Sequence, residues 1–228
     1  MNRTKNTIGW CDYSWNPITG CLHGCWYCYA KKLFTRFNRS FEPTFHLERM
    51  YDPDFEKLKA GTKIFVCSVS DLFAEWTKPE WRDAVLDKIR DPKYDDLIFQ
   101  MLTKSPEGIP DDSTFPHNTW LGVTVTDQSD VDKIVQLAFV PTEGKRFASF
   151  EPLLGPIILD LNSLSQLDWI IIGKLTGSRK IPLQKEWVQS LINQARVLKV
   201  PVFIKNNVGW SIKIQEFPKA KCGARNLC

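Results

Sequence analysis

Short apolar runs alternate with amphipathic stretches along this 228-residue chain, and the alternation limits the folds open to it. The runs are rich in β-branched and aromatic residues, as buried strands are. They cover residues 63–67, 97–102, 119–125, 146–150, 168–172 and 201–204. Between them, apolar residues recur at helical spacing in residues 79–89, 131–138 and 184–198. We therefore predict an α/β fold with a parallel sheet and helical crossovers, closed as a full or partial TIM-type (β/α) barrel of about six units.

The size and composition of the chain favour one main domain. With 43% hydrophobic and 25% charged residues, the chain suffices for one substantial core. We place the barrel at residues 1–208 and a basic, cysteine-containing tail at 209–228. The net charge of +4 is too small to indicate nucleic-acid binding by itself.

The N-terminus and the cysteine content indicate the compartment. The chain has no apolar signal segment at its start, and no run reaches the roughly 18 apolar residues of a membrane span. Its 7 cysteines are an odd number, which does not suit a framework of disulfides. We expect a cytoplasmic protein with reduced thiols and no contact with a membrane.

Polar residues follow the apolar runs, at the places where catalytic groups gather in such barrels. They are Ser68, Ser70, Asp71, Lys104, Thr124, Glu151, Lys174 and Lys205. Each also suits a less specific role. Asp71 equally fits the cap of the following helix, and Lys104 and Glu151 equally fit an internal ion pair.

Three cysteines, Cys21, Cys25 and Cys28, lie within eight residues of a loop that we place at residues 16–30. Thiolates are soft ligands that suit iron–sulfur clusters, zinc or copper(I). A structural zinc or an electron-transfer cluster normally takes four protein ligands, so three thiolates suggest a cluster with one open iron. The alternative is a structural zinc site completed by His23, Cys11 or a distant cysteine such as Cys222 or Cys228.

The spacing Cys21-x3-Cys25-x2-Cys28, with Tyr27 before the last cysteine, resembles the cluster motif of radical S-adenosylmethionine (radical SAM) enzymes. The wider pattern over residues 16–30 is similar to the spore-photoproduct-lyase-like branch. More of the chain resembles the phage Gp37/Gp68-like family of poorly defined function (DUF5131). The matching stretches are residues 15–20, 64–73, 99–104, 120–125, 151–156 and 167–173.

The resemblance implies a [4Fe–4S] cluster on the three cysteines, with S-adenosylmethionine on the fourth iron. Reductive cleavage of this cofactor would give a 5′-deoxyadenosyl radical that abstracts hydrogen from a substrate. Tyr27 would lie against the adenine. Ser68, Ser70 and Asp71 occupy the place of the family's Gly-Gly-Glu loop, which holds the methionine amino group. The resemblance implies that Asp71 supplies the carboxylate of that loop and that Ser68 or Ser70 supplies a hydroxyl acceptor.

The remaining candidates would face the cofactor or the substrate. Thr124, Lys104 and Glu151 are candidates for ribose, carboxylate or substrate contacts. Lys174 and Lys205 lie where the chain departs from the family's Gly-Gly-Glu-Ser-Gly and Phe-Lys-Gln patterns, so substrate preference is expected to differ there.

The resemblance also implies partners, and the sequence keeps a second function open. A radical SAM enzyme needs a reducing electron donor such as flavodoxin or ferredoxin, and its substrate here is unidentified, with nucleic acid among the options. The alternative function is a non-catalytic zinc- or Fe–S-stabilised binding module of a phage or mobile-element complex. A fourth protein ligand at the metal would distinguish this module from the enzyme.

Overall fold

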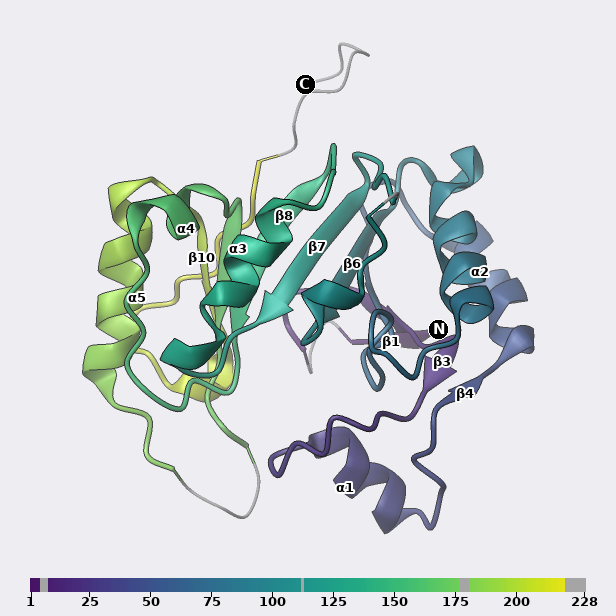
Figure 1. Cartoon of the computed structure of the whole chain (residues 1–228), viewed down its shortest axis with the longest axis horizontal. Helices are drawn as coiled ribbons and strands as arrows, with labels where there is room; N and C mark the ends of the chain where they lie inside the picture. The colour runs from purple at the N-terminus through teal and green to yellow at the C-terminus, as the bar shows by residue number, and fades with distance from the viewer. Residues whose placement is uncertain (5–7, 112, 177–180, 220–228) are drawn as a thin grey trace.

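The computed structural model describes residues 1–4, 8–111, 113–176 and 181–219 (Figure 1). Its centre is an 8-stranded sheet of order β1-β2-β5-β6-β7-β8-β9-β10. The strands from β2 to β10 run parallel, and β1 pairs antiparallel with β2 at one edge. The bounds are β1 Asn2–Arg3, β2 Tyr13–Trp15, β5 Lys63–Val66, β6 Ile98–Thr103, β7 Thr119–Thr124, β8 Lys145–Phe150, β9 Trp169–Ile172 and β10 Val202–Ile204.

The six predicted strands are confirmed as β5 to β10, with ends shifted by at most one residue. The predicted helices are confirmed as α2 Pro79–Arg90, α3 Asp132–Ala138 and α5 Lys185–Val197. The remaining helices are α1 Tyr29–Arg36 and α4 Leu161–Ser165, and 3₁₀ segments cover Leu47–Tyr51, Pro53–Lys57, Pro92–Tyr94, Pro106–Gly108, Gln128–Asp130 and Asn206–Val208. None of the helices described is long and apolar enough to cross a membrane.

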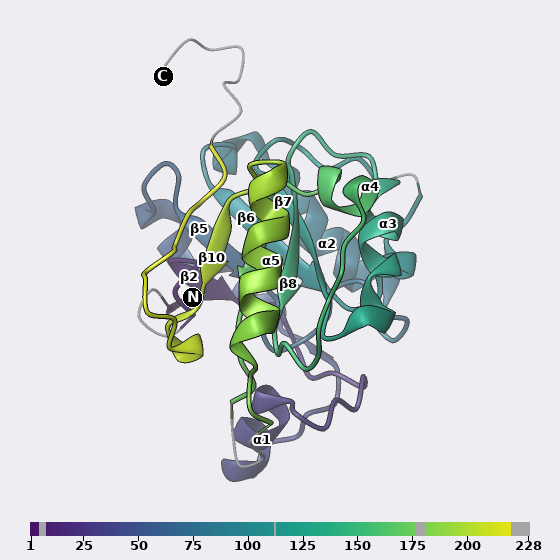
Figure 2. The same cartoon turned by 90° about the vertical axis from the view of Figure 1, so that its left-hand side faces the viewer.

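The sheet separates two apolar layers. Its strand order follows the chain without reversal, and α2 to α5 surround the outside of the curved sheet (Figure 2). Side chains alternate between the faces, so Ile64 and Val66 of β5 join the outer core whereas Phe65 joins the inner layer. That inner layer is largely aromatic and contains Trp10, Phe65, Trp120, Phe147, Trp169 and Phe203.

A closed barrel is not what the described residues form. Their strand pairings leave β1 and β10 at opposite edges of the sheet. The free edge of β10 is covered instead by the chain that follows, since Ile204 N–H donates to Ile214 O at 2.8 Å and Glu216 N–H donates to Val202 O at 3.0 Å. This part of the predicted tail is therefore packed on the domain, while Cys222 and Cys228 lie outside the described residues.

Candidate functional site

The predicted cysteine loop belongs to a longer excursion from the sheet, residues 20–43. Its base is a two-stranded stem in which β3 (Ile18–Thr19) pairs antiparallel with β4 (Thr44–Phe45). Gly20 begins the excursion with φ +88°, and a Cβ there would lie 2.2 Å from Glu42 O. Only glycine fits this close backbone contact, which the Cys21 N–H bond to Phe41 O at 3.1 Å continues.

A cavity of about 900 Å³ lies at the carboxyl ends of the parallel strands. It is bounded by the cysteine loop, by residues 2–4 and 8–10 near the N-terminus, and by residues at the carboxyl ends of β5 to β10. The structure brings every predicted site residue to its wall: Cys21, Cys25, Tyr27, Cys28, Ser68, Ser70, Asp71, Lys104, Thr124, Glu151, Lys174 and Lys205. Their common position follows from the parallel sheet, while their individual roles remain predictions.

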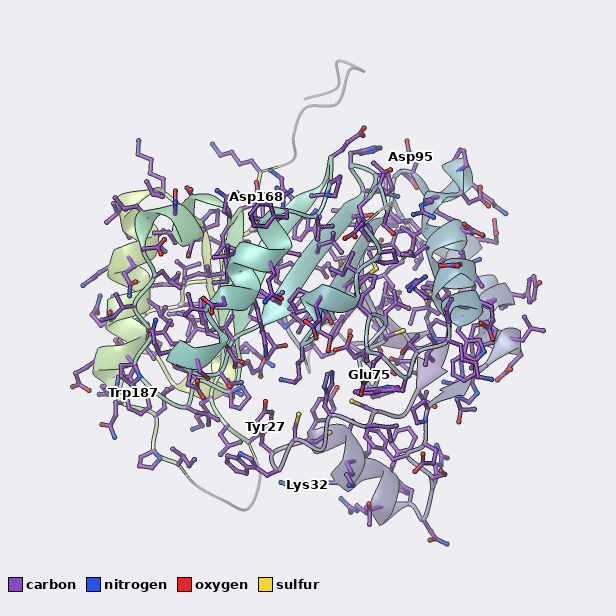
Figure 3. All side chains as sticks on the ribbon, in the orientation of Figure 1. Tyr27, Lys32, Glu75, Asp95, Asp168 and Trp187 are labelled. Carbon is purple, nitrogen blue, oxygen red and sulfur yellow. The ribbon has the colours of Figure 1, made fainter. Side chains whose placement is uncertain are left out.

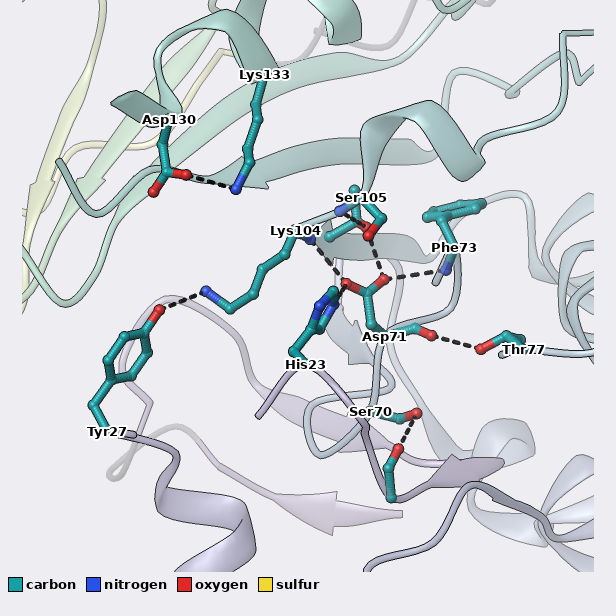
Figure 4. Close-up of polar contacts among 12 residues, drawn as sticks. His23, Tyr27, Ser70, Asp71, Phe73, Thr77, Lys104, Ser105, Asp130 and Lys133 are labelled. Atoms are coloured by element: carbon teal, nitrogen blue, oxygen red, sulfur yellow. Dashed lines mark hydrogen bonds and ion pairs between the residues drawn. The ribbon is translucent and has the colours of Figure 1, made fainter. Parts of the chain in front are cut away.

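Asp71 is buried at the cavity wall and both of its carboxylate oxygens have partners within the protein (Figure 4). Oδ1 accepts hydrogen bonds from Phe73 N–H at 3.1 Å and from the Thr103 hydroxyl at 2.7 Å. Oδ2 accepts from Lys104 N–H and lies beside His23 Nε2, each at 2.8 Å. Asp71 thus organises the loop after β5 and the end of β6. It does not cap the following helix, since the N-cap of α2 is Lys78, which makes no side-chain cap bond.

The serines of the same loop are also bonded internally. The Ser70 hydroxyl donates to Gly20 O at 2.6 Å, and the Ser68 hydroxyl donates to Asn16 Oδ1 at 3.0 Å. Asn16 also accepts from Val69 N–H at 3.3 Å. The sequence reasoning missed Asn16 as a site residue, although it lies inside the predicted loop and its amide suits a turn contact.

Lys104 reaches across the cavity to the cysteine loop, where its Nζ donates to the Tyr27 hydroxyl at 2.9 Å (Figure 4). Burial lowers the pKa of Lys104, because a desolvated ammonium loses its hydration. Burial likewise raises the pKa of Tyr27, so its hydroxyl stays protonated. Two contacts, His23 with Asp71 and Tyr27 with Lys104, therefore hold the cysteine loop against the strand ends.

The expected alternative of a Lys104–Glu151 ion pair is wrong, because Glu151 pairs with Lys205 instead. Lys205 follows β10, and its Nζ donates to Glu151 Oε1 beyond the end of β8. Two strands bring these residues together, which no spacing in the sequence reveals. Lys174 is exposed at the rim, where its backbone exchanges hydrogen bonds with the Asn207 side chain at 3.4 and 3.2 Å.

The three cysteines are half-buried on the cavity wall. Cys28 is the N-cap of α1, and its Sγ accepts from Lys31 N–H at 3.3 Å. Burial raises the pKa of Cys21 to about 11 in the metal-free protein. In the described part of the chain, no three His, Cys, Asp or Glu side chains already converge into a metal-binding group.

The side chains considered as a fourth ligand for a structural zinc do not lie free beside the three cysteines in the described part of the chain. Cys11 is buried beside the Thr4 hydroxyl, at 3.2 Å, and does not line the cavity. His23 lines the cavity, but its Nε2 is already engaged by Asp71. Cys222 and Cys228 lie outside the described residues.

Fold and site together define an α/β protein with a curved parallel sheet whose carboxyl edge carries a cavity lined by thiols and lysines. The chain belongs to the family described as "Protein of unknown function (DUF5131)", which matches residues 5–227. Among solved structures, it is similar to a spore photoproduct lyase mutant with bound AdoMet and dinucleoside spore photoproduct. That match has 10% identity and a TM-score of 0.49, and covers 80% of this chain and 60% of the other. Comparison with curated proteins gives no match.

Proposed function

We propose that this protein is a radical SAM enzyme of the cytoplasm, with a [4Fe–4S] cluster held by Cys21, Cys25 and Cys28. When bound, the cluster and S-adenosylmethionine supply reductive cleavage of the sulfonium and hydrogen abstraction from a substrate. The observation that carries the proposal is that one cavity, of about 900 Å³, has on its wall both the three thiols and polar residues from six successive strand ends, β5 to β10. A reducing donor such as flavodoxin or ferredoxin completes the system.

The donor set fits such a cluster in its chemistry. Cys21, Cys25 and Cys28 come from one short loop beside a cavity, and as three thiolates on a cluster they would leave one iron for a ligand that is not a protein side chain. Gly24 has φ +65° with only one heavy atom, Leu22 O at 3.9 Å, near the place of a Cβ, so the loop between the cysteines has room to adjust. Metal binding would then order the three thiols around one point.

The residues around the thiols divide into two groups in this proposal. Ser68, Ser70 and Asp71 position the loops, because their oxygens are bonded to the protein's own groups. Tyr27 and Thr124 remain as surfaces for the adenosyl group.

The four charged residues would orient the substrate and exclude water. Lys104 and the Glu151–Lys205 pair lie partly buried on the cavity wall. Lys174 stands exposed at the rim, where a negatively charged group of an incoming molecule would meet it first.

Anaerobic reconstitution, followed by iron, sulfide and zinc analysis, tests the proposal. We expect about four irons and four sulfides per chain, and an electron paramagnetic resonance spectrum of the reduced protein that shifts when S-adenosylmethionine is added. Cys25→Ala should lose this cluster, whereas Cys67→Ala, at a buried cysteine off the cavity wall, should keep it. One bound zinc without sulfide would instead favour the non-catalytic module.

A further inference from the structure

Helix α1 projects from the body of the protein next to the cavity (Figures 1 and 2). It lies in the excursion that the β3–β4 stem carries, and only Ala30 of its eight residues is fully buried. The Tyr29 hydroxyl ties its first turn to the loop after β5 by donating to Ser68 O at 2.8 Å. An isolated helix of this length is marginal in water. The fold thus exposes a segment that its own packing hardly stabilises.

The charge of this segment is entirely positive. No aspartate or glutamate occurs between Asp12 and Glu42, whereas Lys31, Lys32, Arg36 and Arg39 all lie there and are exposed. Within the described part of the chain, no carboxylate forms an ion pair with any of these four. Lys32 and Arg36 repel each other at spacing i,i+4, a cost that a bound anion would remove.

Large apolar side chains lie among these cations. Tyr29 is 54% exposed, Phe37 60% and Trp26 45%. Tyr29 and Leu33 are one helical turn apart, and Phe37 follows at the end of α1, so an apolar stripe runs beside the Lys32–Arg36 stripe. Figure 3 shows Lys32 on α1, away from the sheet, and Tyr27 between α1 and the sheet. We name Lys31, Lys32, Arg36, Phe37 and Arg39 the α1 platform.

The α1 platform lies next to the cavity. Cys28 and Tyr29 belong both to the start of α1 and to the cavity wall. Two further exposed cations, Arg3 and Lys174, stand at the cavity wall, on the segments of β1 and the loop after β9. A flexible polyanion could contact α1 and these cations together, whereas a flat membrane would meet α1 alone.

We infer that the α1 platform binds single-stranded nucleic acid and leads one of its nucleotides to the cavity. Lysine and arginine would neutralise phosphates, and exposed rings would stack on bases, which is how single strands are bound without sequence preference. The inference names the substrate class of the proposed enzyme and depends on that proposal only for the chemistry inside the cavity.

Fluorescence anisotropy with short labelled single-stranded DNA and RNA, over a series of salt concentrations, tests the platform. We expect the logarithm of the binding constant to fall linearly with the logarithm of the salt concentration. The double variant Lys32→Gln/Arg36→Gln should reduce the slope by about 1.4, since each phosphate contact contributes about 0.7 on single strands. The matched control is Lys59→Gln/Lys199→Gln. It removes two exposed cations that precede β5 and β10, at the amino ends of the strands and away from the cavity, and should leave the slope unchanged.

Stacking of bases on the α1 platform is tested by a second pair of variants. Phe37→Ala should weaken binding by roughly 5- to 150-fold. Phe139→Ala, at an exposed phenylalanine after α3, should have no effect. Inorganic polyphosphate, which has charge without bases, should compete poorly with the oligonucleotide.

Three results would overturn the inference: no binding at low salt, equal slopes for the two double variants, or binding to phosphatidylserine vesicles in place of the oligonucleotide. Iron and sulfide analysis of the same proteins separates the two proposals. A cluster without oligonucleotide binding refutes the platform alone, and oligonucleotide binding without a cluster refutes the enzyme alone.

Discussion

His23 Nε2 lies 2.8 Å from Asp71 Oδ2, and this contact joins the cysteine loop to the loop after β5. The same carboxylate accepts hydrogen bonds from Phe73, Thr103 and Lys104. Three segments distant in sequence are therefore held at one buried group, which is 4% exposed. Together with the Tyr27–Lys104 contact, this group holds the cysteine loop against the sheet.

Asp71→Ala should lower the free energy of unfolding by about 3 kcal/mol, because several buried donors lose their acceptor at once. Urea denaturation measures this change. Asp160→Ala is the control: Asp160 is exposed and only caps α4 through Ser163 N–H, so its loss should cost about 1 kcal/mol. Equal losses in the two variants would show that Asp71 contributes no more than a single helix cap does.

Gly20→Ala should destabilise the stem of the cysteine excursion by roughly 2–4 kcal/mol, since it combines a left-handed backbone with a steric clash against Glu42 O. Gly61→Ala provides the comparison. Gly61 has φ +76° with nothing within 4 Å, so only the backbone cost of about 1 kcal/mol applies. Thermal or urea unfolding of both variants separates the clash from the backbone cost, and a mild Gly20→Ala would contradict the close approach.

The thiols of the metal-free protein should differ in reactivity. Burial raises the pKa of Cys67 to about 12 and that of Cys11 to about 11, so neither forms the reactive thiolate readily. Cys25 and Cys28 are half-buried at the cavity and accessible to a small reagent. Brief iodoacetamide treatment and peptide mass mapping should therefore modify Cys25 and Cys28 before Cys11 and Cys67. Modification of Cys67 at the same rate would contradict its burial.

Stability should depend on pH through Glu216, which accepts two hydrogen bonds from Arg196 at 2.7 and 2.8 Å. These bonds, despite partial burial, lower the pKa of Glu216 below its ordinary value. Its stabilisation is thus complete above the pKa of an unfolded glutamate and is lost as the pH falls through the lower folded value.

Glu216→Gln should therefore cost about 0.5 kcal/mol at neutral pH, a value reduced for solvent screening of this exposed pair, and less in acid. Urea denaturation at neutral and acidic pH measures the difference, and Arg196→Met should reproduce it. A cost that stays constant with pH would exclude the ion pair as its cause.

Much of the fold was predictable because its signals are local. The apolar runs at β5 to β10 are buried on both faces of a sheet, and the helical spacing in α2 and α5 is regular. The strands β1 and β2, of two and three residues, were missed because such short segments carry no periodicity. Helix α1 was missed because its exposed surface carries apolar and basic residues without a clear buried face.

The site was predictable in its members but not in their partners. Parallel strands end at one edge, so residues such as Thr124 and Lys205 were expected to share a cavity wall. Whether Lys104 meets Glu151 or Tyr27 depends on the distance across that cavity and on the direction of each side chain. The Asp71 contacts likewise depend on where the cysteine loop folds back.

The sequence by itself determined the alternation of strands and helices, the three-cysteine loop and the edge at which the polar residues gather, because side-chain periodicity and spacing are properties of neighbouring residues. Only the tertiary structure decided that Lys205 pairs with Glu151, that Asp71 binds three segments, and that α1 stands exposed beside the cavity. Those arrangements depend on which distant segments the curvature of the sheet brings within a few ångströms of one another. The spacing of residues along the sequence carries no information on these distances.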